Sequence, residues 1–549
     1  MPLQKNQVLT LQVERLSSDG SGVAHSPEGE TVFIPGAAPG DEARVRIVKD
    51  CKRYAFGILD EVLTPSPDRI PVDCAVAGPC GGCSLRHLDY AAELRAKQEN
   101  VADAFARIGG LDVPVLPIVG SPEIDRYRNK VQFPVGTDKA GRPCIGFYAG
   151  RTHRIVPCPD CRLQPGVLNE IGNTLCAFFA EKGIHPYNEE TGKGLVRHIF
   201  LRRGAHSGQI MVCLVCTRAK LPSADELCTR LKEAFPDIVT ILLNVNAKNT
   251  NVILGSETHT LYGQGYIEDT LCGVPVQLGP LSFYQVNTLA AEQLYGIAAE
   301  YAQLTPDDLL LDLYCGMGTI GLSMADHCRE LVGVEIVPEA IESAKANAAR
   351  MSAAVSAKSR FFCADAGQAA AQLAAEGLHP DVVMLDPPRK GCDEATLSAV
   401  VRMAPRRVVY VSCNPATAAR DAAWLEQNGY HAEKVQPVDL FPRTKHVECV
   451  IALSKGEIDS KKVRVEFSLE GMDTSGLQKG ATYPEIKARV LEQTGLKVSS
   501  LYISQVKQKC GLEVRENHHK AKSENVKQPQ CPKEKEDAIV EALRHFQMI

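Results

Sequence analysis

Apolar and polar residues alternate over much of the first 65 residues, with the period of two that is typical of β-strands. The clearest runs are Val8–Leu16, Glu30–Pro35, Glu42–Val48 and Ala55–Val62. Turn-forming Gly, Pro and Asp residues separate these runs, and no helical period intervenes. This pattern predicts a small, OB-like β-barrel over residues 1–65. The proline-rich stretch Thr64–Pro71 is typical of a linker.

Two further patterns follow the linker. Residues 66–300 contain a helical run from about Tyr90 to Ile108 and then short strands and helices without a repeat, which predicts an α+β central domain. Over residues 301–455 apolar strands alternate with helical segments, which predicts an open, mostly parallel, Rossmann-like sheet. The strand segments are Leu309–Tyr314, Leu331–Glu335, Arg360–Asp365, Val382–Asp386, Arg407–Ser412 and His446–Leu453.

The last segment, residues 456–549, is polar, with 16 Lys and Arg residues against 14 Asp and Glu residues. Tyr483–Thr494 and Ser499–Lys509 have the pattern of two helices joined by a short turn, loosely like a helix-turn-helix. A solubilising appendage is the alternative, and the role of this segment stays open.

Composition narrows the class of protein. At 549 residues, with 44% apolar and 23% charged residues, the chain is typical of a multidomain globular protein. It has no apolar run of the roughly 18 residues that cross a membrane and no apolar stretch at its start, so we expect a cytoplasmic protein without a membrane partner. Twenty cysteines then predict reduced thiols, a few with metal or catalytic roles.

The net charge of −5 hides a basic stretch. Residues 121–220 hold 15 Lys and Arg against 8 Asp and Glu, which favours contact with nucleic acid there. Within it, Arg126, Arg128 and Lys130 alternate, and on a strand they would share one face suited to phosphates.

A cofactor pocket is indicated by the turn after strand Leu309–Leu313. Gly316, Gly318 and Gly321 have GxGxxG spacing, and Glu335 ends the next strand, where a carboxylate can accept ribose hydroxyls. These features predict a nucleoside-containing cofactor, either NAD or S-adenosylmethionine. Asp386 is followed by two prolines that hold it at the edge of the sheet, and this turn favours a methyltransferase that acts on a flat heteroaromatic ring.

Two reactive side chains follow later strands. Cys413 precedes Pro415, a favourable first helical residue, so a helix dipole should favour its thiolate. Glu448 lies within an apolar run, where a carboxylate is costly without a partner or a task. We interpret Cys413 as a nucleophile and Glu448 as a general base, against a buried small hydrophobe and a structural ion pair.

Cysteine spacing also predicts a metal site. Cys74, Cys80 and Cys83 have metal-ligand spacing, and Cys158 or Cys161 could supply a fourth thiolate. Such a set holds zinc or an iron–sulfur cluster, and spacing does not choose between them.

Five ordered motifs resemble the RNA 5-methyluridine methyltransferase family over about residues 5–453. They are FYQVN (283–287), DLYCGMGTIG (312–321), LDPPRKG (385–391), VSCNP (411–415) and HVECV (446–450). The resemblance implies that Cys413 is the nucleophile and Glu448 the base. It also implies that four residues contact S-adenosylmethionine: Gln285, Tyr314, Glu335 and Asp386. To these we add Asp365, which we expect near the adenine.

The same resemblance extends to the N-terminal half. GSGVAH and TVFIPGAAPGD resemble a TRAM domain, an RNA-binding barrel. The family's iron–sulfur branch implies a [4Fe-4S] cluster on Cys74, Cys80, Cys83 and Cys161. Barrel and cluster together resemble the branch that acts on 23S ribosomal RNA, so we predict a monomeric 23S ribosomal RNA uracil-C5 methyltransferase. A transfer-RNA methyltransferase, an iron–sulfur NAD oxidoreductase and a silent RNA-binding protein are the alternatives.

Overall fold

The computed structural model describes residues 3–150, 152–248, 251–456, 483–494, 496, 498–510 and 531–546. The chain forms two compact units, Met1–Asp459 and Ser460–Ile549, which are described separately. Among the described residues, no helix combines the length and the apolar character needed to span a membrane.

The predicted N-terminal barrel is confirmed. Its five strands close in the order β1-β2-β3-β5-β4. Alternate residues point inward, and the interior is filled mainly by Val, Ile, Leu and Ala side chains such as Val13, Ile34 and Val45. The strands are β1 (Val8–Leu16), β2 (Ser21–His25), β3 (Thr31–Pro35), β4 (Glu42–Asp50) and β5 (Tyr54–Thr64).

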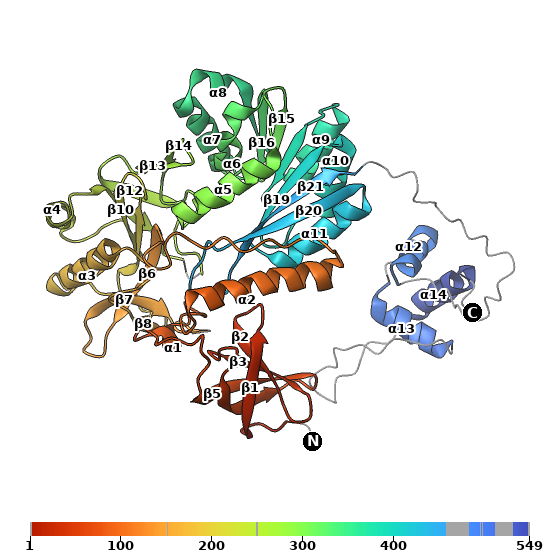
Figure 1. The fold of residues 1–549 in the computed structure, drawn as a ribbon, viewed down its shortest axis with the longest axis horizontal. Coiled ribbons are helices and arrows are strands. Elements are labelled where there is room, and N and C mark those ends of the chain that lie inside the picture. The colour runs from red at the N-terminus through yellow and green to blue at the C-terminus, as the bar shows by residue number, and fades with distance from the viewer. Residues whose placement is uncertain are drawn as a thin grey trace. The chain divides into compact units, whose positions relative to one another are not determined.

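A long helix connects the barrel to the rest of the unit (Figure 1). After the short α1 (Ala77–Cys80), α2 (Tyr90–Asp103) begins where the Asp89 side chain accepts the Ala92 N–H. The sequence predicts one helix to Ile108; in the structure the last turn, Ala104–Gly109, is a π-helix (η1) that ends at Gly110 in the left-handed region.

The central domain is built on a seven-stranded sheet of order β12-β11-β10-β9-β6-β7-β8, and a β13-β14 hairpin follows it. Its fully buried strand β10 is the apolar run Ile210–Cys216. The other strands are β6 (Lys130–Thr137), β7 (Pro143–Tyr148), β8 (Ile155–Pro157), β9 (Val196–Arg203), β11 (Ile238–Val245), β12 (Glu257–Tyr262), β13 (Ile267–Leu271) and β14 (Val274–Leu278), with helices α3 (Gly166–Glu181) and α4 (Ala224–Ala234).

The predicted Rossmann-like sheet is also present, in the order β17-β16-β15-β18-β19-β21-β20. Strands β15 to β19 are parallel, and β21 is antiparallel to both of its neighbours. They are β15 (Leu309–Leu313), β16 (Glu330–Glu335), β17 (Ser359–Cys363), β18 (Val382–Leu385), β19 (Arg407–Ser412), β20 (Tyr430–Val438) and β21 (Glu448–Lys455). The sequence missed β20, whose alternation is interrupted by a bulge between Ala432 and Lys434.

Helices cover both faces of this sheet. One apolar cluster joins the sheet to α5, α6 and α7, and a second joins it to η1, α9, α10 and α11. The helices are α5 (Thr288–Ala302), α6 (Thr319–Ser323), α7 (Pro338–Met351), α8 (Ala353–Lys358), α9 (Ala366–Ala375), α10 (Glu394–Met403) and α11 (Pro415–Gln427). Because the chain leaves β15 in opposite directions to reach β16 and β18, the carboxyl ends of these strands border a crevice of the kind in which ligands bind.

The C-terminal unit contains the two predicted helices, α12 (Tyr483–Thr494) and α13 (Ser500–Lys509). A third helix, α14 (Lys533–His545), was not predicted. Ile486, Val490, Ile503, Val506 and Ile539 pack together in its small core.

Candidate active site

The glycine turn after β15 is held by carboxylates from the strand ends. Tyr314, Gly316 and Gly318 all have positive φ angles, of 66°, 54° and 79°. The Gly316 N–H donates to Glu335 Oε2 at 3.2 Å, and nothing lies within 4 Å of the place where a Cβ on Gly316 would be. The backbone there is therefore open to a ligand.

Asp312 supports the same turn from below, a role the sequence did not indicate. Its Oδ2 accepts the Gly321 N–H at 3.0 Å, and a Cβ on Gly321 would lie 2.8 Å from that oxygen, so the contact requires glycine. Burial raises the pKa of Asp312 to about 8, and the nearby charges of Asp386 and Glu335 act in the same direction.

The structure brings most of the predicted cofactor residues to one edge. Tyr314, Glu335 and Asp386 follow or end the adjacent strands β15, β16 and β18. Gln285 lies just before α5, and Asn129 holds it there by donating to its carbonyl at 2.7 Å. Asp365 caps α9, accepting the N–H groups of Gly367 and Gln368, so its contact with adenine stays a prediction.

Strand register brings the two predicted reactive groups together. Strands β19 and β21 are antiparallel neighbours in which Ser412 pairs with Cys449. Cys413 follows the first strand and Glu448 begins the second, so both lie at the same end of adjacent strands. Their electrostatic interaction raises the pKa of the Cys413 thiol.

Burial governs the protonation of this pair. Burial raises the pKa of Glu448 to about 8, with a smaller contribution from Asp386. Burial also raises the pKa of Cys413 to about 11, the charges of Glu448 and Asp386 add to the rise, and Arg389 opposes it. Desolvation and two carboxylates therefore oppose the thiolate that the start of α11 is expected to favour.

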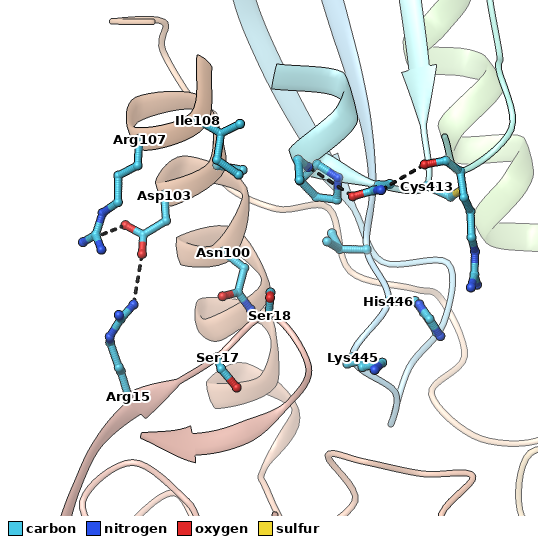
Figure 2. Close-up of a pocket in the computed structure, with 16 residues that line it drawn as sticks. Arg15, Ser17, Ser18, Asn100, Asp103, Arg107, Ile108, Cys413, Lys445 and His446 are labelled. Carbon is cyan, nitrogen blue, oxygen red and sulfur yellow. Dashed lines mark hydrogen bonds and ion pairs between the residues drawn. The ribbon is translucent and has the colours of Figure 1, made fainter. Parts of the chain in front are cut away.

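A cavity of about 500 Å³ opens in front of Cys413. Figure 2 shows its walls: the turn after β1, the end of α2, and the loops that carry Cys413 and His446. An ion pair between Arg15 and Asp103, 3.1 Å long, joins the barrel to α2 at its rim. Cys413 therefore faces a space between the barrel and the Rossmann-like sheet.

Cations from separate elements gather near this cavity. Arg389, Lys445 and His446 line it, and the charges of Arg128, Arg389 and Lys445 help to lower the pKa of His446 to about 4, after the larger effect of burial. In the part of the chain that the structure describes, none of Arg128, Lys130, Arg389 and Lys445 has a carboxylate partner within ion-pair distance. The sequence analysis did not single out Arg389, Lys445 and His446 as site residues. Arg389 and His446 lie inside two of the motifs, and Lys445 directly precedes one of them.

The predicted row of Arg126, Arg128 and Lys130 on one strand is wrong. Strand β6 begins only at Lys130. Arg126 has a φ of 59° and donates to Asp160 and to the Cys161 carbonyl, so it holds the loop that carries Cys161. Lys130 instead lies opposite Arg202, and burial together with Arg202 and Arg128 lowers the pKa of Lys130 to about 8.

The predicted metal ligands lie near one another without forming a metal site. The thiols of Cys80 and Cys83 both interact electrostatically with Cys161, and Cys80 interacts with Cys74. Cys161 is hydrogen-bonded to Cys158. Across the described ranges, no group of three or more His, Cys, Asp or Glu residues is arranged to hold a metal ion. The iron–sulfur prediction is therefore not confirmed.

Known proteins resemble the chain over most of its length. Residues 277–456 match the family tRNA (uracil-5-)-methyltransferase, and residues 2–59 match the TRAM domain. An uncharacterized RNA methyltransferase of Halalkalibacterium halodurans is 44% identical over 453 residues, which are 82% of this chain and 98% of the relative. One from Clostridium tetani is 41% identical over 454 residues, with 83% and 98% covered.

A solved structure agrees with these matches. The Pyrococcus abyssi tRNA (uracil-54, C5)-methyltransferase in complex with S-adenosyl-L-homocysteine superposes with a TM-score of 0.65 at 27% identity. The match covers 81% of this chain and 100% of that one. The extent of these matches, together with the glycine turn and the paired strand ends, shows that the chain is an RNA methyltransferase and belongs to the RNA uracil-5-methyltransferase family.

Proposed function

We propose that the protein methylates C5 of a uracil in RNA through a covalent adduct between Cys413 and C6 of the base. The observation that supports this most is the register of β19 and β21, which puts a cysteine and a buried carboxylate at the same end of adjacent strands. Uracil C5 is a weak nucleophile, and addition of a thiolate to C6 makes it reactive.

The residues of the turn fit S-adenosylmethionine. Gly316 leaves an open approach to the backbone, and Glu335 uses its two oxygens to fix the turn, accepting the Gly316 and Val337 N–H groups. Tyr314, Glu335, Asp386 and Gln285 would hold this cofactor, with Asp365 near the adenine. The cofactor supplies the electrophilic methyl group. A sulfonium cation beside Asp386 would also offset the carboxylate charge that opposes a Cys413 thiolate.

Cys413 and Glu448 then act in sequence. Cys413, as the thiolate, bonds through its sulfur to C6, and the electron pair that this places on C5 would take the methyl group of the cofactor, which would leave as S-adenosylhomocysteine. Glu448, in its ionised form, removes the proton from C5. The C5–C6 double bond forms again, and the C6–S bond breaks with its electron pair returning to sulfur.

RNA would occupy the cavity in front of Cys413. A uracil within folded RNA must leave its stack to reach Cys413, and the cations that line the cavity, Arg389 and Lys445, are suited to the phosphates on either side of it. We propose 23S ribosomal RNA as the substrate and a cytoplasmic location, because the barrel and the cysteine group together resemble that branch. The archaeal neighbour acts on tRNA, which keeps transfer RNA as the second candidate.

Tritiated S-adenosylmethionine would test this function. The protein is incubated with unmodified transcripts of bacterial 23S ribosomal RNA and, separately, of bacterial tRNAs; we expect 5-methyluridine in the first. 5-Fluorouridine transcripts should trap a covalent complex, and Cys413→Ser should abolish it. The control is Cys363→Ser, which changes an exposed cysteine at the end of β17 and should leave the complex intact. Methylation of tRNA alone would reject the ribosomal substrate, and an adduct that survives in Cys413→Ser would reject the mechanism.

We also propose a [4Fe-4S] cluster on Cys74, Cys80, Cys83 and Cys161. The donor set fits in kind, because the neighbouring groups are thiols rather than carboxylates or histidines. Anaerobically purified protein should contain about four irons per chain, and Cys80→Ala should lose them; one zinc per chain would reject the cluster.

A further inference from the structure

The loop 439–447 joins β20 to β21 and ends at the proposed base. Val438 pairs with Glu448 across the two strands, so the loop closes directly before this carboxylate. The same loop carries Lys445 and His446, which line the cavity in front of Cys413. The conformation of the loop therefore decides where three groups of the site lie.

Arg443 has an unusual backbone conformation within this loop. Its φ angle is 67°, in the left-handed region that favours glycine, and only 6% of the residue is exposed. A buried arginine keeps such a conformation only if its surroundings compensate for the strain, and such residues are found at functional sites more often than elsewhere.

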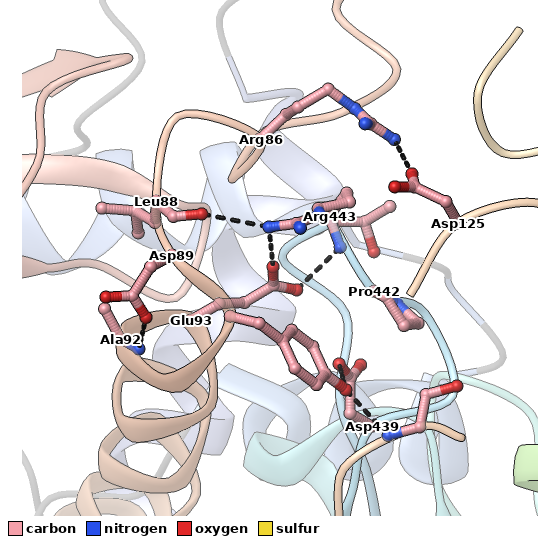
Figure 3. A network of polar contacts seen from close by, with 12 residues as sticks. Arg86, Leu88, Asp89, Ala92, Glu93, Asp125, Asp439, Pro442 and Arg443 are labelled. Atoms are coloured by element: carbon pink, nitrogen blue, oxygen red, sulfur yellow. Dashed lines mark hydrogen bonds and ion pairs between the residues drawn. The ribbon is translucent and has the colours of Figure 1, made fainter. Parts of the chain in front are cut away.

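The segment 85–93 supplies that compensation, as Figure 3 shows for Leu88 and Glu93. The Arg443 N–H donates to Glu93 Oε1 at 2.7 Å, and its carbonyl accepts the Leu85 N–H at 3.1 Å. The guanidinium donates to the Leu88 carbonyl at 3.0 Å and lies 3.8 Å from Glu93 Oε2. Both main-chain groups of Arg443 and its guanidinium are thus held by one segment.

The rest of the loop is fixed to the same region of the chain. Lys97 on α2 donates to Asp439 at 2.7 Å and to the Phe441 carbonyl at 3.1 Å. Tyr90 donates to the other Asp439 oxygen, and Tyr127 donates to the Pro442 carbonyl. None of these groups lines the cavity. The network therefore holds the loop on the side that faces away from the cavity.

We propose that Arg443 is a positioning residue that sets Glu448 for the removal of the C5 proton. This inference rests on the proposed role of Glu448. In that step the C5–H bond breaks, the proton passes to the Glu448 carboxylate, the C5–C6 double bond forms, and the C6–S bond breaks toward Cys413. Displacement of the loop would slow this step more than the earlier bond formation by Cys413, which lies on a different strand.

Arg443→Gly isolates the side chain, because glycine keeps the positive φ without strain. Single-turnover reactions on the methyl-accepting transcript, with unmodified uridine, measure formation and decay of the covalent complex. We expect decay to slow on the order of 10- to 100-fold, as for a displacement of about 1 Å, while formation and S-adenosylmethionine binding by calorimetry change less than about threefold. Gln303→Gly, at another positive φ outside the loop, should leave both rates unchanged.

Two further variants make the result decisive. Arg443→Lys keeps a cation within reach of the Leu88 carbonyl and should slow decay less than Arg443→Gly; it decides the matter if the glycine variant fails to bind S-adenosylmethionine. Glu448→Gln should accumulate the complex. Rapid decay in Glu448→Gln would reject the proposed base itself. If Glu448→Gln traps the complex, the proposed base stands. In that case, normal decay in the Arg443 variants, or equal slowing of formation and decay, would overturn only the positioning role of Arg443.

Discussion

Lys97 is a buried cation, and we expect its replacement to lower the stability of the protein strongly. It is 1% exposed, and its ammonium lies 2.7 Å from Glu93 Oε1 and 2.7 Å from Asp439 Oδ1, both on side chains with no exposed surface. Lys97→Met keeps the length and apolar stem of the side chain but removes the cation. Glu93 then keeps only the Arg443 guanidinium, 3.8 Å away, as a cationic partner, and Asp439 keeps the Tyr90 hydroxyl but has no ion-pair partner among the described residues.

The size of the effect follows from this burial. Removing one partner of a buried ion pair costs about 3–5 kcal/mol, because the remaining charge stays out of water. For the unit Met1–Asp459, which contains α2 and β21, this corresponds to a melting midpoint lowered by roughly 3–5 °C. Substitution of an exposed pair costs about 0–1 kcal/mol, so Lys345→Met, which breaks the exposed pair with Glu342, is the matched control.

The stability lost in Lys97→Met should also depend on pH, and the pKa of Glu93 decides the direction. Burial already raises the pKa of Glu93 despite Lys97, and without the cation it rises further. A carboxyl whose pKa is higher in the folded state is favourable to folding when neutral, and this benefit is lost as pH rises through that pKa. Lys97→Met should therefore be most destabilising near pH 8 and less so near pH 5.

Thermal unfolding of the full chain, followed by circular dichroism at both pH values, tests this reasoning. The triple variant Glu93→Gln, Lys97→Met, Asp439→Asn removes all three charges and should recover part of the loss. A Lys97→Met midpoint within about 1–2 °C of the parent at pH 8, or a larger loss at pH 5 than at pH 8, would refute it.

Three other results are expected. Since burial raises the pKa of Glu448 to about 8, decay of the covalent complex should accelerate from pH 6.5 to 9 in single-turnover assays, and a flat profile would contradict a titrating base. Lys445→Met should lower the slope of log affinity for RNA against log salt by about 0.7–0.9, as for one lost phosphate contact, while the exposed Lys139→Met should not; equal slopes would remove Lys445 from the interface. Deletion of residues 457–549 should leave methylation within about threefold, because relatives align over 453 residues without this segment; loss of activity would give the C-terminal unit a role in the reaction.

Much of the site could be predicted because its signals are local. The apolar strands, the glycines after Leu313 and the prolines after Asp386 each determine the backbone conformation of only the few residues around them. In a parallel sheet each strand then ends at the same edge, so Tyr314, Glu335 and Asp386 meet there without further information. The sequence singled out Cys413 and Glu448 one by one, and only the neighbouring positions of β19 and β21 in the sheet bring them together.

The protonation of Cys413 and the contacts that hold the loops of the site could not be predicted in this way. Cys413 precedes a helix, which locally favours a thiolate, yet burial and two carboxylates raise its pKa to about 11. Those groups come from other strands, and a sequence does not show how far they remove a thiol from water. The same limit applies to Arg126, which the alternating pattern placed on a strand and the structure pairs with Asp160.

The sequence by itself therefore determined the elements, the glycine turn and the candidates for the reacting side chains, since these depend on local periodicity, backbone preference and short motifs. Only the tertiary structure decided how they are held. Arg443 is separated from Leu88 by 355 residues along the chain, and its strained conformation is stable because Leu85, Leu88 and Glu93 bond to it. Burial and long-range hydrogen bonds arise only when distant segments pack together, and they decide where Glu448 lies and when it carries a proton.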